Sequence, residues 1–178
     1  MNEISAELAH TVGQVDGAEA SRLVTAMAQA DKIFVAGGGR SGFMAKAFVM
    51  RMMHMGLNAY VVGETVTPSL QENDLFIVGS GSGETGSLLA MTEKAKTIGA
   101  TVAAVTTNPT SSIGKLADLH LTIPAQAKAE GASGKSIQPM GSLFEQSLLV
   151  VYDALVLAYM EQHHITADAM FGTHANLE

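Results

Sequence analysis

The chain has 178 residues, of which 47% are hydrophobic and 15% charged, a composition typical of one compact folded domain and not of a disordered chain. A net charge of −7 without a basic cluster argues against a nucleic acid partner, and the lack of cysteine excludes disulfides and thiolate chemistry. The longest apolar run, residues 148–160, is too short for a bilayer, and the N-terminal sequence MNEISAELAH is no signal peptide, so we expect a cytoplasmic protein without a membrane partner.

Apolar residues at helical spacing predict a helix over residues 3–30, or two helices joined near Gly13 and Gly17. Residues 32–36 (KIFVA) predict a short buried strand, which runs into a first glycine loop at residues 37–42. The helix expected next, over residues 41–55, is apolar nearly all round. A helix of that composition is buried on more than one side, so we expect it to lie between subunits of an oligomer.

The rest of the chain alternates between strand and helix patterns. Strands are expected at residues 58–62, 75–78, 101–106 and 120–123, and helices from Thr85 to about Ile98, at 111–116 and at 140–162. A polar loop at 125–139 is long enough to suggest a functional role. Such alternation predicts an α/β fold with a five-stranded parallel sheet, helices on both faces and the flavodoxin-like order 2-1-3-4-5. We expect one domain over residues 1–178.

A second glycine loop, residues 79–85 (GSGSGET), follows the strand at 75–78 and precedes a helix. Its glycines let the backbone approach a ligand closely, and the first amides of the helix are free to bind an anion. Ser80, Ser82 and Thr85 add hydroxyl groups. Because no P-loop lysine follows, the pattern favours a phosphate monoester over a nucleoside triphosphate. The alternative is a loop that only turns the chain and caps the helix.

The first glycine loop also fits the GxGxxG pattern, with Gly37, Gly39 and Gly42 after a strand and before a helix. Glu64 lies about where a dinucleotide fold places its ribose-binding acid, so a nucleotide-binding module is the main rival interpretation. That hypothesis leaves the hydroxyls of the second glycine loop unexplained and lacks a second domain. The simpler prediction is that Gly39, Arg40 and Ser41 line the sugar side of a phosphate pocket.

Five segments together resemble the sugar isomerase (SIS) domain family: VAGGGRSG, NAYVVGETVTP, VGSGSGET, MGSLFEQ and a closing HANLE. Within that family they are most similar to the 6-phospho-3-hexuloisomerases, over essentially the whole chain. The resemblance implies a tetramer, no cofactor, and interconversion of D-arabino-3-hexulose 6-phosphate and fructose 6-phosphate. It also implies a functional link to hexulose-6-phosphate synthase in the ribulose monophosphate pathway of formaldehyde fixation. Residues 170–173 (MFGT) depart from the family, which has a basic residue just before the closing histidine.

The chemistry implied by the resemblance needs one base that moves a proton between two carbons through a cis-enediol. Glu145, at the start of an apolar helix, is the candidate, because apolar surroundings raise the pKa of a carboxyl group. The alternative is a glutamate that only complements the helix dipole. His54 is expected to donate a proton to the substrate oxygens, across a subunit interface if the site is shared, and His174 is the weaker candidate.

The remaining predictions concern ligands and rival functions. Gly81, Gly83 and Glu84 complete the expected substrate-binding set in the second glycine loop. No HxH, HExxH or carboxylate cluster indicates a metal site, so neither a metal nor a cofactor is expected. A regulatory module that senses a sugar phosphate, and an aldose–ketose phosphate isomerase of the same fold, remain alternatives. Residues alone do not choose the carbon at which isomerisation occurs; only the family resemblance does.

Overall fold

The computed structural model describes residues 1–125 and 136–177. Within these ranges, five strands form one parallel sheet in the order β2-β1-β3-β4-β5. Gly37 at the end of β1 pairs with Gly79 at the end of β3, so the two glycine loops leave the sheet side by side. The strands are β1 (Ile33–Gly37), β2 (Ala59–Val61), β3 (Leu75–Gly79), β4 (Thr101–Thr106) and β5 (Leu119–Thr122).

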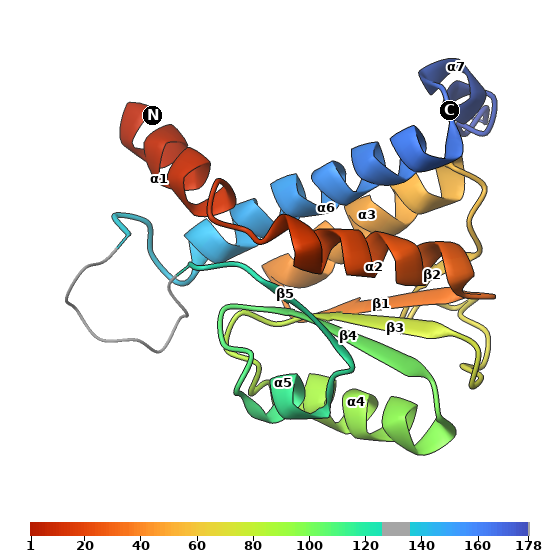
Figure 1. Cartoon of the computed structure of the whole chain (residues 1–178), viewed down its shortest axis with the longest axis horizontal. Coiled ribbons are helices and arrows are strands. Elements are labelled where there is room, and N and C mark those ends of the chain that lie inside the picture. The colour runs from red at the N-terminus through yellow and green to blue at the C-terminus, as the bar shows by residue number, and fades with distance from the viewer. Residues whose placement is uncertain (126–135, 178) are drawn as a thin grey trace.

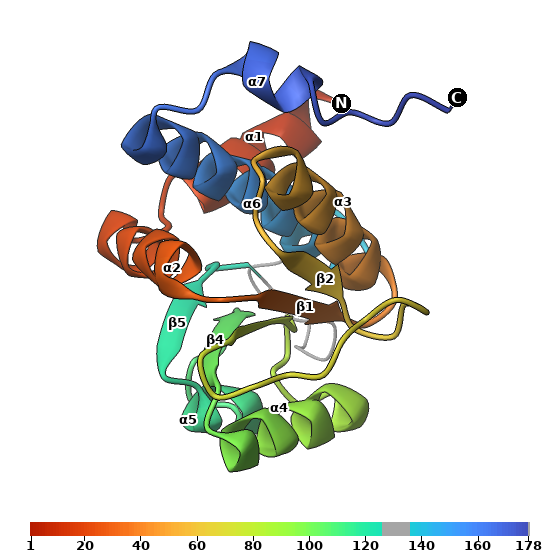
Figure 2. The same cartoon turned by 90° about the vertical axis from the view of Figure 1, so that its right-hand side faces the viewer.

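Helices cover both faces of this sheet, and Figures 1 and 2 show the helix–sheet–helix layering from two sides. α2, α3 and α6 lie over one face, and α4 and α5 lie over the other. α1 packs against α6, and α7 follows the far end of α6. The helices are α1 (Asn2–Val12), α2 (Gly17–Gln29), α3 (Arg40–His54), α4 (Gly86–Ile98), α5 (Ser112–Leu116), α6 (Ser142–His163) and α7 (Ala167–Phe171).

The strands supply both cores because successive side chains point to opposite faces of a sheet. Ile33 and Val35 of β1 join the core under α2, α3 and α6, whereas Phe34 and Ala36 join the core over α4 and α5. The aromatic ring of Phe48 on α3 stacks on that of Tyr152 on α6, with ring centroids 4.3 Å apart. This stack fixes the two helices that carry most of the candidate site.

The predicted fold class and strand order are confirmed, and the predicted elements agree with the observed ones to within about two residues at each end. The N-terminal region forms two helices, which confirms the second of the two alternatives predicted for residues 3–30. α7 was not predicted. It has only 5 residues and begins at a Thr166 side chain that accepts a hydrogen bond from the Ala169 amide. Most of the predicted loop at 125–139 falls on residues 126–135, outside the described ranges.

α6 is the one helix of the described chain that is long and apolar enough, by length and composition, to cross a membrane. It has 22 residues, and 56% of its most apolar window is buried inside the domain. Tyr152 and Leu148 are completely buried against the sheet layer. The apolar composition of α6 is therefore that of a core helix.

Candidate active site

A small pocket lies beyond the carboxyl ends of β1 and β3, where both glycine loops meet the start of α6. Its volume is about 80 Å³. A water molecule in the liquid occupies about 30 Å³, so the pocket suits a group the size of a phosphoryl group and not a dinucleotide. The residues that line it come from all three segments: Gly38, Ser41, Gly79, Ser80, Gly81, Ser82, Thr85, Leu88, Gly141, Phe144 and Glu145.

The second glycine loop is held rigidly by the neighbouring strand. The Gly81 carbonyl accepts hydrogen bonds from the hydroxyls of Thr107, at 2.7 Å, and Thr106, at 3.2 Å. The Gly83 carbonyl accepts one from the Ile113 amide at 3.0 Å. Gly83 has a φ of 67°, and a Cβ there would overlap the Ser111 hydroxyl, so only glycine fits at this position. The loop is therefore set in one conformation before a ligand binds.

Three hydroxyl groups of this loop differ in what they already contact. Ser80 is buried, and its oxygen accepts a hydrogen bond from the Gly83 amide at 3.2 Å. Ser82 accepts one from the Glu84 amide at 3.2 Å. Thr85 is the N-cap residue of α4, and its hydroxyl makes no capping bond; it lies 3.4 Å from the Ser80 hydroxyl. Thr85 and the first amides of α4 are thus the groups best placed to receive an anion.

Glu84 has a different role from the one predicted. Its Oε1 accepts a hydrogen bond from the Ser112 amide at 2.8 Å, and hydrogen bonding by the Ser112 side chain, followed by its amide, lowers the pKa of the Glu84 carboxyl group. The Glu84 side chain therefore stabilises the first turn of α5, and Glu84 is not among the residues that line the pocket. The sequence did not indicate to which side of the loop this side chain turns.

The first glycine loop serves close packing of β1 against α3. A Cβ on Gly37 would lie 2.8 Å from the Ser41 carbonyl carbon, and one on Gly42 would lie 2.7 Å from the Gly37 oxygen. Glu64, the proposed ribose ligand of the dinucleotide hypothesis, instead forms an ion pair with Lys46 at 2.7 Å on the surface. The GxGxxG pattern thus has a packing explanation, and the geometry does not favour the nucleotide-binding alternative.

Glu145 and Arg40 form an ion pair that the sequence analysis did not anticipate. The Glu145 residue is only 1% exposed, and its Oε2 lies 2.8 Å from Nη1 of Arg40. The same nitrogen donates to the hydroxyl of Ser142 at 2.9 Å. The Arg40 side chain is 51% exposed, so the rest of its guanidinium group is accessible to solvent. A buried carboxylate and an arginine that can bind oxyanions therefore lie together beside the phosphate-sized pocket.

The rings of His54 and His174 lie next to each other and away from Glu145. Their rings are stacked with centroids 5.5 Å apart, at the last turn of α3 and in the C-terminal tail. The Thr173 hydroxyl ties the tail down by donating to the His54 carbonyl at 2.8 Å. Burial, followed by the nearby Arg51 and His174, lowers the pKa of His54. Arg51 can only donate to the Nδ1 atom of His54, 3.4 Å away, which assigns the proton of the neutral ring to Nε2.

The length of α3 separates the two groups of candidate residues. Arg40 is the first residue of this 15-residue helix and His54 is the last. At a rise of 1.5 Å per residue the two ends are about 21 Å apart. Within one chain, therefore, His54 and Glu145 cannot contact the same small substrate.

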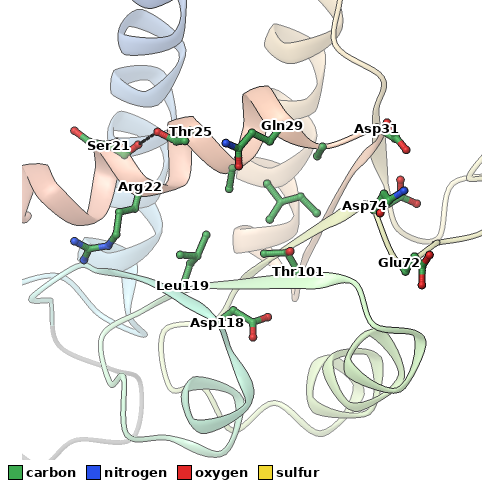
Figure 3. A pocket seen from close by; sticks show the side chains of 14 residues that line it. Ser21, Arg22, Thr25, Gln29, Asp31, Glu72, Asp74, Thr101, Asp118 and Leu119 are labelled. Atoms are coloured by element: carbon green, nitrogen blue, oxygen red, sulfur yellow. Dashed lines mark hydrogen bonds between the residues drawn. The ribbon is translucent and has the colours of Figure 1, made fainter.

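A larger hollow, of about 760 Å³, opens at the other edge of the sheet, below the amino ends of the strands. Figure 3 shows labelled carboxylate side chains around it, with Asp31, Asp74 and Glu72 on the side away from Arg22. Two of its carboxylates are paired with lysines, Asp74 with Lys32 and Asp118 with Lys96, and the hollow is remote from both glycine loops. The acidic residues in it are Asp31, Glu72, Asp74 and Asp118.

No group of three or more His, Asp or Glu side chains in the described part of the chain is arranged to hold a metal ion.

The comparison with protein families gives a direct match. The model of the SIS domain matches residues 26–150, which include both glycine loops, the Arg40–Glu145 pair and the start of α6. The chain belongs to the SIS domain family. The 3-hexulose-6-phosphate isomerase of Bacillus subtilis is 52% identical over 99% of this chain and 96% of its own length. The protein of the same name from Mycobacterium gastri is 42% identical over 97% of this chain and 86% of its own.

A solved structure agrees with these relatives. A protein from Methanococcus jannaschii, whose crystal structure was taken to infer a molecular function of 3-hexulose-6-phosphate isomerase, superimposes with a TM-score of 0.85. It is 32% identical, and the match covers 99% of this chain and 96% of the other. The likeness therefore extends over the whole fold, including the helices outside the residues that the family model matches.

Proposed function

We propose that this chain is a 3-hexulose-6-phosphate isomerase, which converts D-arabino-3-hexulose 6-phosphate to fructose 6-phosphate. The observation that carries the proposal is the buried Glu145 carboxylate, paired with Arg40 at 2.8 Å beside a phosphate-sized pocket. The names of the relatives supply the substrate and the carbon position. They give no support to an aldose–ketose reaction or to a purely regulatory module.

In the proposed mechanism Glu145 is the general base. It takes the proton from C2 of the hexulose phosphate, and the carbonyl at C3 becomes the enediolate. The C2 hydroxyl then passes its proton to the C3 oxygen, and Glu145 returns the carbon-bound proton to C3, which leaves a carbonyl at C2 and a hydroxyl at C3, as in fructose 6-phosphate. One carboxylate can serve both carbons if it lies over the C2–C3 bond. Arg40 is positioned to stabilise the negative charge that develops on the two oxygens.

The phosphate is assigned to the second glycine loop and the N-terminus of α4. The hydroxyls of Thr85 and Ser82 and the first amides of α4 supply donors without a positive side chain, at the favourable end of a 13-residue helix. Ser80 and Gly81 line the pocket, and Ser41 would close its sugar side; Gly39 is the N-cap residue of α3 and is not among the lining residues. Binding the phosphate there would position the reacting carbons near Glu145.

We propose that the complete site is shared between two subunits of a homotetramer. The outer face of α3 carries Phe43, Met50 and Met53, which are 64%, 46% and 42% exposed. This apolar stripe runs between Arg40 at one end of α3 and His54 at the other. A two-fold axis that crosses the middle of α3 pairs the helix with its copy in the antiparallel sense, and so brings the partner subunit's His54 to Arg40.

This arrangement gives the histidines a function. The pocket is too small to enclose a whole hexulose phosphate, so most of the substrate would lie outside it. A second subunit would supply the missing contacts. His54 would then donate from Nε2 to a substrate oxygen in its neighbour's site, and His174 would support its ring. A second, different two-fold interface would join two such pairs into a tetramer.

We further propose that residues 1–178 are a single SIS domain, that the protein is soluble and cytoplasmic, and that it needs no cofactor. Its substrate would be supplied by hexulose-6-phosphate synthase from ribulose 5-phosphate and formaldehyde. In support, α1 and α7, which lie outside the matched family range, pack against the same core helices.

A coupled assay tests the proposed function. The purified chain is mixed with hexulose-6-phosphate synthase, ribulose 5-phosphate and formaldehyde in the presence of a chelator, and fructose 6-phosphate is measured. We expect its formation to depend on the chain. If hexulose phosphate accumulates unchanged while the synthase is active, the proposal is wrong.

A further inference from the structure

An acidic side chain on α1 contacts the segment that leads into α6. Oε1 of Glu7 accepts a hydrogen bond from the Ile137 amide at 2.8 Å. Its Oε2 accepts from the Ser136 hydroxyl at 2.8 Å and from Nε2 of Gln138 at 3.1 Å. These contacts lower the pKa of Glu7, so the carboxylate stays ionised at neutral pH. One charged group thus holds three consecutive residues that lie about 130 positions away in the chain.

The held segment is joined to the candidate site by a continuous set of hydrogen bonds. Oε1 of Gln138 accepts from Nε2 of Gln146 on α6 at 2.7 Å. The Pro139 carbonyl accepts from the amide and the hydroxyl of Ser142, at 3.0 and 2.7 Å. Ser142 in turn accepts from Arg40, whose Nη1 also donates to Glu145. Figure 1 shows the segment between α1 and the start of α6.

The backbone between these contacts is in an unfavourable conformation. Met140 and Gly141 have φ angles of 60° and 75°. A residue with a Cβ rarely adopts the left-handed region, so Met140 stays there only because its neighbours hold it. Ser142 holds the segment on the α6 side, and Glu7 holds it on the other.

We propose that Glu7 is a positioning residue for the proposed isomerisation. It anchors residues 136–138, and through them it sets the start of α6, with Ser142 and Glu145, against Arg40. The inference rests on the proposed function of Glu145 as the base. Glu7 lies on α1 and is not among the residues that line the pocket, and the three residues to which it is hydrogen-bonded do not line it either, so its effect on the reaction is indirect.

The test compares Glu7→Ala, Glu7→Asp and Gln138→Ala with a control, Glu3→Ala, which removes the same charge from an exposed position of the same helix. We expect Glu7→Ala to lower kcat by about 10- to 100-fold, since a displacement of about 1 Å at a base has effects of this size. KM should change less than about two-fold because the phosphate loop is not touched. Glu7→Asp should recover part of kcat, and Glu3→Ala should equal the wild type.

A double variant tests whether Glu7 and Gln138 act through one network, and melting temperatures separate positioning from a simple loss of stability. Glu7→Ala with Gln138→Ala should lose no more kcat than Glu7→Ala alone, because both changes act on one network. The inference is overturned if Glu7→Ala keeps the kcat of Glu3→Ala, or if a fall in melting temperature accounts for its whole loss of activity. If the wild type itself does not isomerise, the proposed function fails, and amide exchange decides the positioning: the Ser142 and Glu145 amides must exchange faster in Glu7→Ala than in Glu3→Ala.

Discussion

Mixing two inactive variants tests whether the site is shared, and the size of the recovery follows from the geometry. Glu145→Gln keeps the size of the side chain but cannot take a proton, so kcat should fall by about 10²–10⁴-fold. His54→Gln removes the imidazole, which can give up a proton as the glutamine amide cannot, and should cost about 10²–10⁴-fold. Glu145→Gln should not unfold the protein, because Arg40 is half exposed and can be solvated without its charged partner. The fold of His54→Gln is checked by circular dichroism.

If each site takes Glu145 from one subunit and His54 from the other, a mixed pair has one site with both native residues and one with neither. Random exchange of subunits gives mixed pairs about half of the time, so the mixture should reach about a quarter of the wild-type activity. The subunits are exchanged by mild denaturation and renaturation, and fructose 6-phosphate formation is followed. If the mixture stays at the mean of its parents while the wild type recovers after the same treatment, the shared site is wrong.

Three further predictions concern single features. Thr85→Ala should raise KM by about 10-fold or more, since a hydrogen bond to a charged group contributes about 1.5–3 kcal/mol, with little change in melting temperature; an unchanged KM moves the phosphate elsewhere. Met50→Glu places a charge in the apolar stripe of α3 and should give smaller particles in sedimentation, with the fold kept by circular dichroism. The lowered pKa of buried His54 means that the unfolded chain binds a proton below about pH 6.5 that the folded chain does not. Stability should therefore fall as pH falls below that value, and His54→Gln should remove part of this slope in urea titrations.

The features of the fold that depend on local sequence pattern were predicted correctly. The period of the apolar residues and the two glycine loops led to the strand order and to the crevice between β1 and β3. The pairing of Arg40 with Glu145 was not predicted, because 105 positions separate the residues and only the packing of α6 on α3 brings them together. The distance between His54 and the first glycine loop could have been foreseen, since a helix predicted over residues 41–55 already holds its two ends about 20 Å apart.

Other features depend on contacts that no local pattern carries. The turn of Glu84 toward α5 is decided by a hydrogen bond to the Ser112 amide, 28 positions away. The role of Glu7 depends on a helix that the sequence indicates only as amphipathic and acidic. Glu84 was predicted to bind substrate and Glu7 was given no role, and both became interpretable only when their partners were known.

The measurement that tests the central claim most directly is deuterium transfer during turnover. Wild-type protein converts hexulose 6-phosphate in deuterated water, and the fructose 6-phosphate is analysed by NMR; Glu161→Gln, at the exposed far end of α6, is the control. If Glu145 is the base of an enediol mechanism, the wild type and the control place deuterium at C3 of the product, and Glu145→Gln loses both exchange and turnover together. Turnover near the wild-type rate in Glu145→Gln, with deuterium still entering C3, would contradict the account.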